Sequence, residues 1–296
     1  MRKSWLPAYI ALGITWGCSF IFIELGLEFL TPFGVAFARC ALGAITLLIV
    51  VRSRKIALPK DKSAWRKLWI VALLLNVVPG ILFAFAQQYV TSVLAGIINA
   101  TTPLMTMVFM LLLFREQKLK REQIIGLFIG AFGVMVVLGI WKGVGENQLL
   151  GVVALLLAVS CYGYSFPYTT RKILPLGLKP EAAATVQLIL AAITLLPLYL
   201  FDGIAEDNYQ LNSLLAMLAL GVLGSGFAYI WNFSIIAAAG GSIASTVTYV
   251  TPVVAVFVGW LFLGEQITWH EPVGAVFVIL GAAITQGRFT SKVVSK

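Results

Sequence analysis

The chain has 296 residues, of which 60% are hydrophobic and 11% are charged, and its mean hydropathy is +0.97. An ordinary globular protein is about 45–50% apolar and about 25% charged, so this excess would leave a large apolar surface in water. The composition therefore excludes a water-soluble domain. It predicts an all-α integral membrane protein, because each apolar segment in lipid must satisfy its own backbone as a helix.

Ten apolar runs, bounded by charged or turn residues, predict ten transmembrane helices, since a bilayer needs roughly 20 apolar residues per helix. These helices are expected near residues 6–28, 33–51, 68–89, 92–114, 122–141, 149–169, 182–201, 213–236, 241–263 and 271–288.

The net charge of +9 is distributed unevenly along the chain. If the N-terminus is cytoplasmic, 19 of the 21 lysines and arginines fall in cytoplasmic segments, and only Lys142 and Arg39 do not. The positive-inside rule then predicts a multi-pass protein of the cell (inner) membrane with both termini in the cytoplasm. The basic charge is thus a topology signal, and no nucleic-acid partner is expected.

Several motifs occur twice. Thr102-Pro103 and Glu116-Gln117 recur as Thr251-Pro252 and Glu265-Gln266 at a constant separation, and 16–20 (Trp-Gly-Cys-Ser-Phe) is echoed by 162–166. Each half contains five predicted helices, an odd number, so the second half enters the membrane upside down. We therefore expect two inverted five-helix repeats, at residues 1–146 and 147–296, which is an architecture of secondary transporters.

These features together resemble one known group of proteins. The two five-helix halves, the motif at 16–20, the Thr-Pro kinks and Gly-Glu-Gln at 264–266 are similar to the drug/metabolite transporter superfamily, and most of all to its ten-helix EamA-type permeases. The resemblance implies export or exchange of small metabolites, often amino acids. Within the family, the pattern looks most like bacterial exporters of aromatic and neutral amino acids.

Two prolines lie near the middle of predicted helices. Because proline has no N–H, Pro103 and Pro252 free the carbonyls of Asn99 and Thr248 at membrane depth. The neighbouring hydroxyls either line a shared cavity or bond back to their own helix. We expect two further helices to be interrupted at Pro79-Gly80 and at 224–226, so the predicted hinges are Pro79, Gly80, Pro103, Gly224, Gly226 and Pro252.

A second set of residues combines polar or aromatic character with membrane depth, and we expect it to line a substrate-binding cavity between the repeats. The set is Trp16, Ser19, Arg39, Asn99, Thr102, Tyr162, Tyr164, Ser165, Tyr229, Thr248 and Thr251. Core packing is the alternative for the aromatic rings. For Arg39 the alternatives are a substrate carboxylate and a structural bond to backbone carbonyls.

Few fixed charges and many rings favour a zwitterionic amino acid, exported by alternating access. No carboxylate lies at the predicted membrane centre, since Glu24 falls toward an outer helix end, so we expect facilitated export without obligatory proton exchange.

No catalytic or metal-binding constellation is present in the sequence, so neither an enzyme nor a cofactor is expected. The three cysteines, Cys18, Cys40 and Cys161, all fall in apolar runs and are predicted to be packing thiols. Alternative functions are export of other amphipathic metabolites or drugs, a sugar-phosphate or nucleotide-sugar carrier, and a lipid-acting membrane enzyme. A monomer is favoured, with a homodimer as the alternative.

Overall fold

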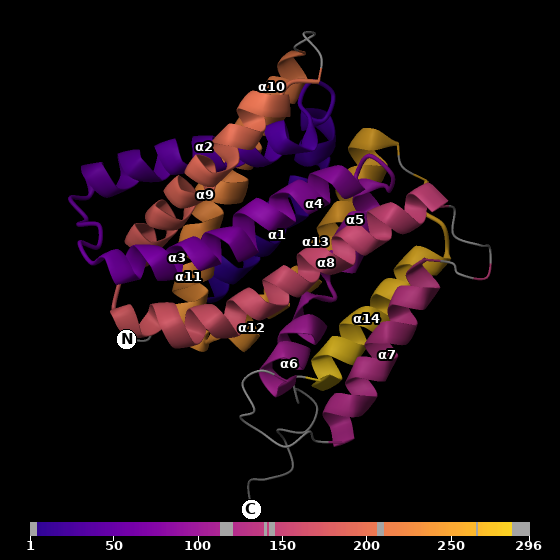
Figure 1. Cartoon of the computed structure of the whole chain (residues 1–296). Coiled ribbons are helices and arrows are strands. Elements are labelled where there is room, and N and C mark those ends of the chain that lie inside the picture. The colour runs from indigo at the N-terminus through magenta and orange to yellow at the C-terminus, as the bar shows by residue number, and fades with distance from the viewer. Residues whose placement is uncertain are drawn as a thin grey trace, which may run out of the picture.

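The computed structural model describes residues 5–112, 121–138, 141, 146–205, 210–264 and 266–285. Across these ranges the chain is helical, and the only β-type pairing within them is an isolated bridge between Leu30 and Ile204. The helices form one bundle (Figure 1). Glu116, Lys142 and Glu265 lie outside the described residues.

The first half of the chain forms α1 to α7. Its elements are α1 (Leu6–Gly26), α2 (Pro32–Ser53), α3 (Lys62–Ala72), the π-helical η1 (Leu73–Val77), α4 (Val78–Ala86), α5 (Ser92–Asn99), α6 (Thr102–Leu112) and α7 (Arg121–Val137). Threonine and aspartate side chains cap several of these helices. Asp61 accepts hydrogen bonds from the backbone N–H groups of Ser63 and Ala64, which is why α3 begins before the predicted apolar run.

The second half forms α8 to α14. Its elements are α8 (Glu146–Tyr168), η3 (Thr169–Ile173), η4 (Leu174–Leu176), α9 (Pro180–Asp202), α10 (Leu211–Ala219), the π-helical η5 (Leu220–Phe227), α11 (Ala228–Ala239), α12 (Gly241–Ser245), the 3₁₀-helical η6 (Thr246–Tyr249), α13 (Thr251–Val258), η7 (Gly259–Leu263) and α14 (His270–Thr285). Gly240 alone joins α11 to α12, and its positive φ of 85° is a conformation that glycine adopts without strain.

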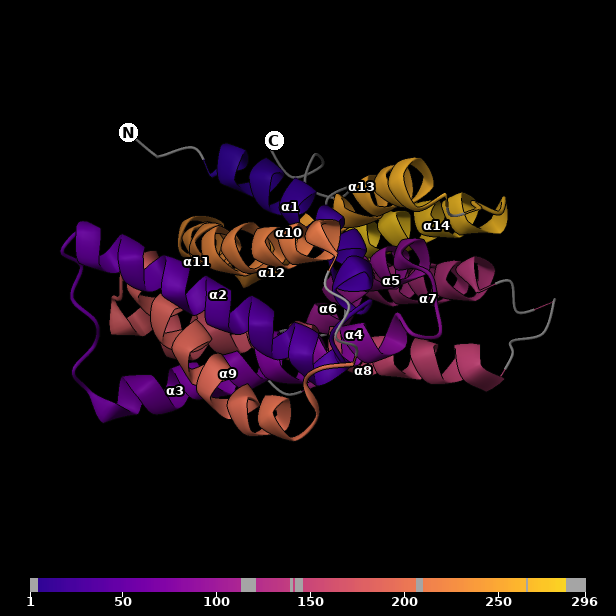
Figure 2. The same ribbon diagram turned by 90° about the horizontal axis from the view of Figure 1, so that it is seen from above.

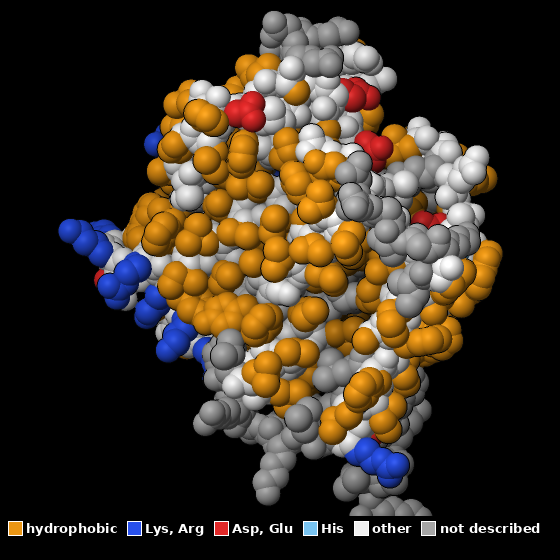
Figure 3. All heavy atoms as spheres, turned by 45° about the vertical axis from the view of Figure 1, so that its right-hand side comes forward, with side chains coloured by type: hydrophobic (Ala, Val, Ile, Leu, Met, Phe, Trp, Pro, Cys, Tyr) orange, Lys and Arg blue, Asp and Glu red, His pale blue; other side chains and the backbone are white. Residues whose placement is uncertain are grey.

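Each of the ten predicted apolar runs is mainly helical over its described part, with turns at Ala100-Thr101 and at Val250. Among the described residues, eight helices are long and apolar enough to cross a membrane, and Ile124–Val137 and His270–Gly281 are shorter apolar helices. A band of hydrophobic side chains covers the visible face between basic and acidic ends (Figure 3), as expected for a surface that faces lipid.

Helices of the two halves pack against each other throughout the bundle. α2 packs against α9, α4 and α6 pack against α8, and α1 packs against α13. Figure 2 shows α7 and α14 side by side at one edge, where they make their main contact with each other. A Cβ atom at Gly281 would lie 2.4 Å from the backbone nitrogen of Gly130, so glycines let these two helices approach closely.

The expected interruptions at Pro79-Gly80 and 224–226 are wrong in form. The backbone stays helical from Lys62 to Ala86 and from Leu211 to Ala239, and in each span it widens into a π-helical segment, η1 or η5. A π-helical turn accommodates an extra residue without ending the helix. At the two Thr-Pro sequences, by contrast, the α-helix does stop: α5 ends before α6, and η6 separates α12 from α13.

Candidate functional site

A cavity lies among helices from both halves of the chain, and we call it the central cavity. It is lined by Trp16, Ser19, Phe20 and Ile23 of α1, Arg39 of α2, Leu75 of η1, Phe83 of α4, Asn99 of α5, Tyr162 and Phe166 of α8, Tyr229 of α11 and Thr248 of η6. Its volume of about 40 Å³ is room for about three water molecules. In this conformation an amino acid could enter only if the surrounding helices or side chains moved.

Two aromatic side chains from opposite halves meet at the cavity wall. The rings of Trp16 and Tyr229 have their centroids 6.0 Å apart at an interplanar angle of 65°. The indole Nε1 of Trp16 donates to the carbonyl of Gly224 over 3.2 Å, and the Tyr229 hydroxyl donates to the carbonyl of Leu75 over 2.8 Å. Both rings therefore have fixed orientations and present apolar faces.

The two accepting carbonyls occupy matching places in the halves. Leu75 lies in η1 and Gly224 lies in η5, and their separation of 149 residues equals that between Thr102 and Thr251. Pro79 has no N–H to bond the Leu75 carbonyl in an α-helical pattern. The π-helical segments thus turn backbone acceptors toward the aromatic wall.

Arg39 is a buried cation in the same wall. Its side chain is 5% exposed, and its Nε donates to the hydroxyl of Ser225 over 3.1 Å. Among the described residues, no carboxylate lies within ion-pair distance of Arg39, and the terminal nitrogens of its guanidinium make no hydrogen bond. A buried cation without a counter-ion is costly, which sets Arg39 apart from an ordinary packing residue.

The matching position in the second half carries a neutral side chain; α2 and α9 begin at Pro32 and Pro180, 148 residues apart, as are Arg39 and Gln187. Gln187 of α9, which is fully buried, donates from Nε2 to Oδ1 of Asn76 in η1. Asn76 and Ser225 are 149 residues apart. The two halves therefore make equivalent helix-to-helix contacts, but only the Arg39 contact brings a charge to the central cavity.

The hydroxyls beside the two prolines bond back across each kink to the helical segment that precedes it. Thr102 Oγ1 donates to the Asn99 carbonyl over 2.7 Å, and Thr251 Oγ1 donates to the Thr248 carbonyl over 2.9 Å. Each threonine thus satisfies the carbonyl that the next proline frees. The Asn99 amide then donates to Thr251 Oγ1 over 3.3 Å and links the two kinks directly.

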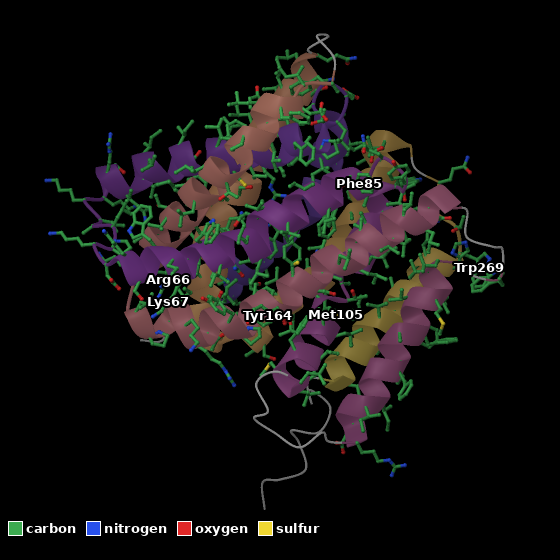
Figure 4. All side chains as sticks on the ribbon, in the orientation of Figure 1. Arg66, Lys67, Phe85, Met105, Tyr164 and Trp269 are labelled. Atoms are coloured by element: carbon green, nitrogen blue, oxygen red, sulfur yellow. The ribbon has the colours of Figure 1, made fainter. Side chains whose placement is uncertain are left out.

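Four predicted site residues do not line the central cavity: Thr102, Tyr164, Ser165 and Thr251. The Tyr164 ring instead contacts the rings of Phe109 and Tyr168, with centroids 5.7 and 6.1 Å away. Figure 4 labels Tyr164 on α8 and Met105 on the neighbouring helix α6. Ser165, like Ser19 and Thr248, donates to a backbone carbonyl three or four residues earlier in the chain.

The predicted set also omitted several lining residues, namely Phe20, Ile23, Leu75, Phe83 and Phe166. Phe20 and Phe166 each follow a lining aromatic residue by four positions, a spacing that keeps both on one helix face. That signal was available in the sequence.

Part of the wall of the central cavity is an aromatic layer, and the helices that carry this layer continue to a second cavity. The Phe20 and Phe83 rings lie 5.8 Å apart, and Phe83 also stacks on Tyr162 at 5.7 Å. About one helical turn further along each helix, Glu24 and Gln87 line the second cavity, which we call the polar vestibule. Gln87 Nε2 donates to the Phe20 carbonyl over 2.9 Å and holds the layer in place.

Comparison with known proteins decides the family. The model of the EamA-like transporter family matches residues 3–139 and again residues 149–286. The chain belongs to the EamA-like transporter family. The family model thus covers both halves of the chain in turn.

Two of the following three relatives of this EamA-like protein have names that include the word transporter. It is 28% identical over 286 residues to the uncharacterized inner membrane transporter YedA of Escherichia coli (strain K12), covering 95% of this chain and 90% of YedA. It is 23% identical over 285 residues to the uncharacterized transporter YoaV of Bacillus subtilis (strain 168), covering 96% and 97%. Protein PecM of Dickeya dadantii (strain 3937) is 27% identical over 271 residues, covering 92% and 88%.

A solved crystal structure of another protein has the same fold. It aligns with a TM-score of 0.69 and 19% identity, over 98% of this chain and all of the other. Family, relatives and apolar helices together make this EamA-like protein a multi-pass integral membrane transporter.

Proposed function

We propose that this EamA-like protein exports small zwitterionic solutes, with neutral or aromatic amino acids as the substrate class. The observation that carries the proposal is Arg39, a buried guanidinium that lines the central cavity without a carboxylate partner among the described residues. A ligand carboxylate would supply the missing countercharge and could accept two parallel hydrogen bonds from the guanidinium.

The rest of the cavity fits the other end of such a solute. Trp16, Tyr162 and Tyr229 offer rings for an apolar or aromatic side chain, while Ser19, Asn99 and Thr248 add neutral polar groups. A phosphorylated sugar or nucleotide sugar needs several cations, and Arg39 is the one Lys or Arg side chain among the described lining residues. The proposal therefore favours a single carboxylate over a phosphate.

The proposed mechanism is alternating access between two inverted five-helix repeats, residues 1–146 and 147–296. Equivalent contacts in the two halves support this arrangement. The carbonyls of Leu75 in η1 and Gly224 in η5 accept equivalent hydrogen bonds, and the two Thr-Pro kinks are stabilised in the same way. Pro79, Gly80, Pro103, Gly224, Gly226 and Pro252 are the proposed hinges, and a monomer in the lipid bilayer is the proposed working unit.

The proposed orientation places both termini in the cytoplasm. Figure 3 shows Lys and Arg side chains gathered at one end of the molecule and Asp and Glu side chains at the other. The exposed basic residues include Arg54, Lys55 and Lys62, whereas Glu28 and Asp202 are exposed at the opposite end. The positive-inside rule assigns the basic end to the cytoplasm.

Transport into proteoliposomes tests the substrate class. Vesicles holding the full-length protein are preloaded with phenylalanine or alanine, and counterflow of the labelled amino acid is compared with counterflow of glucose 6-phosphate and of UDP-glucose. We expect exchange of the amino acids alone.

A second experiment imposes a pH gradient across the same proteoliposomes. Because no carboxylate lies among the described residues that line the central cavity, we expect no accumulation against the amino acid gradient.

A further inference from the structure

The polar vestibule has an unusual lining for a cavity in so apolar a chain. Its polar lining residues include Glu24 of α1, Gln87 and Gln88 at the end of α4, Gln148 of α8 and Glu271 of α14, and its volume is about 340 Å³. Two of these side chains are carboxylates. No lysine or arginine occurs among the vestibule residues that the structure describes.

The side-chain amide of Gln87 gives a second, independent indication that a ligand binds in the vestibule. The residue is only 7% exposed, and its Nε2 is committed to the Phe20 carbonyl at 2.9 Å. That bond fixes which end of the amide is the acceptor, and the Oε1 atom is buried without a hydrogen-bond partner. A buried acceptor that lacks a donor lowers stability, so a native structure normally pairs it with a group supplied from elsewhere.

The surrounding groups specify what that donor must be. The Glu271 carboxylate is held in place, because its Oε2 accepts from the backbone N–H of Thr268 at 2.8 Å and from the Thr268 hydroxyl at 3.1 Å. An ionised carboxylate accepts hydrogen bonds but donates none, and the free atom of Gln87 is also an acceptor. A cation that bears N–H donors or takes oxygen ligands would suit the two carboxylates and the free amide oxygen at once.

We propose that the polar vestibule binds a cationic group, either the primary ammonium of a solute or an alkali metal ion, through Glu24, Gln87 and Glu271. The site is separate from the central cavity, since the two cavities share no lining residue. Glu24 and Gln87 follow Phe20 and Phe83 by one helical turn, so the vestibule could hold the ammonium of a zwitterion that has passed these rings. Binding of the cation itself requires neither transport nor Arg39.

Thermal unfolding of the purified full-length protein in detergent tests this site directly. The midpoint is measured in rising concentrations of ethylammonium chloride or sodium chloride, with choline chloride added to keep the ionic strength constant. Choline has a bulky quaternary nitrogen and no N–H donor, so it serves as the reference cation. We expect saturable stabilisation by at least one of the two test cations. A response to ethylammonium alone identifies the amine, whereas a response to sodium identifies an alkali ion.

Variants place the binding in the vestibule. Glu24→Gln and Gln87→Leu should each raise the half-saturating concentration about tenfold, as expected when a hydrogen bond to a charged group is lost. Gln148→Glu adds a carboxylate to the vestibule and should lower the half-saturating concentration. This third variant still tests the site if either of the first two fails to fold. Glu122→Gln, at an exposed site on α7, is the matched control and should leave it unchanged.

Two results would overturn the proposal. The first is an equal effect of ethylammonium, sodium and choline on the unchanged protein. The second is a half-saturating concentration that stays the same in the three vestibule variants, or that moves equally in Glu122→Gln.

Discussion

Arg39 differs from its counterpart Gln187 in a way that a substrate could use. Both side chains tie α2 or α9 to a π-helical segment of the other half, but only Arg39 brings spare N–H donors to the central cavity. Replacing Arg39 by glutamine keeps a donor for Ser225 and removes the charge. Loss of substrate binding can thereby be separated from loss of the helix contact.

We predict that Arg39→Gln raises the KM of phenylalanine exchange about tenfold, the loss expected for a hydrogen bond to a charged group. Exchange of phenylalaninamide, which has no carboxylate, should be unchanged by the substitution. Counterflow in proteoliposomes measures both. Arg54→Gln, which removes an exposed ion pair with Glu181, is the control and should affect neither. An equal loss for both solutes would show that Arg39 is structural.

The sequence could predict which residues line the central cavity only where the geometry of a single helix decides the question. Tyr162 and Tyr164 are two positions apart, so an α-helix points them roughly 200° apart and they could not both line one cavity. The structure places Tyr162 at the cavity and Tyr164 against Phe109. In contrast, the bonds from Trp16 to Gly224 and from Tyr229 to Leu75 depend on which helices meet, and the sequence does not state this.

At the scale of elements, the two Thr-Pro kinks form one contact across the centre of the bundle. Thr102 and Thr251 satisfy the carbonyls freed by proline, and Asn99 bonds Thr251 across the gap. Alanine at both prolines would restore the N–H groups and favour straight helices.

We therefore predict that the double variant Pro103→Ala, Pro252→Ala exchanges amino acid about tenfold more slowly, with little change in its melting temperature. Initial rates of counterflow, together with thermal unfolding, distinguish slow switching from misfolding. Pro180→Ala serves as the control, because a proline at the start of α9 frees no helical carbonyl. Unchanged rates in the double variant would count against bending at these kinks.

The α7–α14 pair is held by close approach of glycine backbones. We predict that Gly281→Leu, which forces a side chain against Gly130, destabilises the protein by about 1–3 kcal/mol. Val276→Leu on the exposed side of α14 is the control and should be neutral. Unfolding in detergent measures both variants, and an unaffected Gly281→Leu protein would mean that the pair does not need this contact.

The presence of the helices could be predicted from the sequence, but the π-helical geometry of two of their segments could not. Long apolar runs were sufficient to place the eight membrane-length helices of the described residues to within about two helical turns at either end, because lipid leaves few alternatives for the backbone. The π-helical segments η1 and η5 were expected only as interruptions, since Pro79 and the glycines at 224–226 signal irregularity without specifying its geometry. That geometry depends on the side chains of Trp16, Arg39 and Tyr229 packed around them.

At the scale of the whole molecule, orientation follows from charge. We predict that Glu146→Cys reacts with a membrane-impermeant thiol reagent applied outside cells, and that Lys62→Cys reacts only after the membrane is opened. Both variants are made in a protein whose own cysteines, Cys18, Cys40 and Cys161, have been replaced. The reverse pattern would place the basic end outside and refute the proposed topology.

The central claim is that the solute binds in the central cavity, and substrate protection of a cysteine placed there tests it most directly. Thr248→Cys, in the same cysteine-free background, is labelled with a small methanethiosulfonate in proteoliposomes with and without phenylalanine. We predict that phenylalanine slows labelling about tenfold at ten times its half-saturating concentration, whereas glucose 6-phosphate has no effect. If saturating phenylalanine leaves the labelling rate unchanged while the variant still exchanges phenylalanine, the solute does not bind in this cavity.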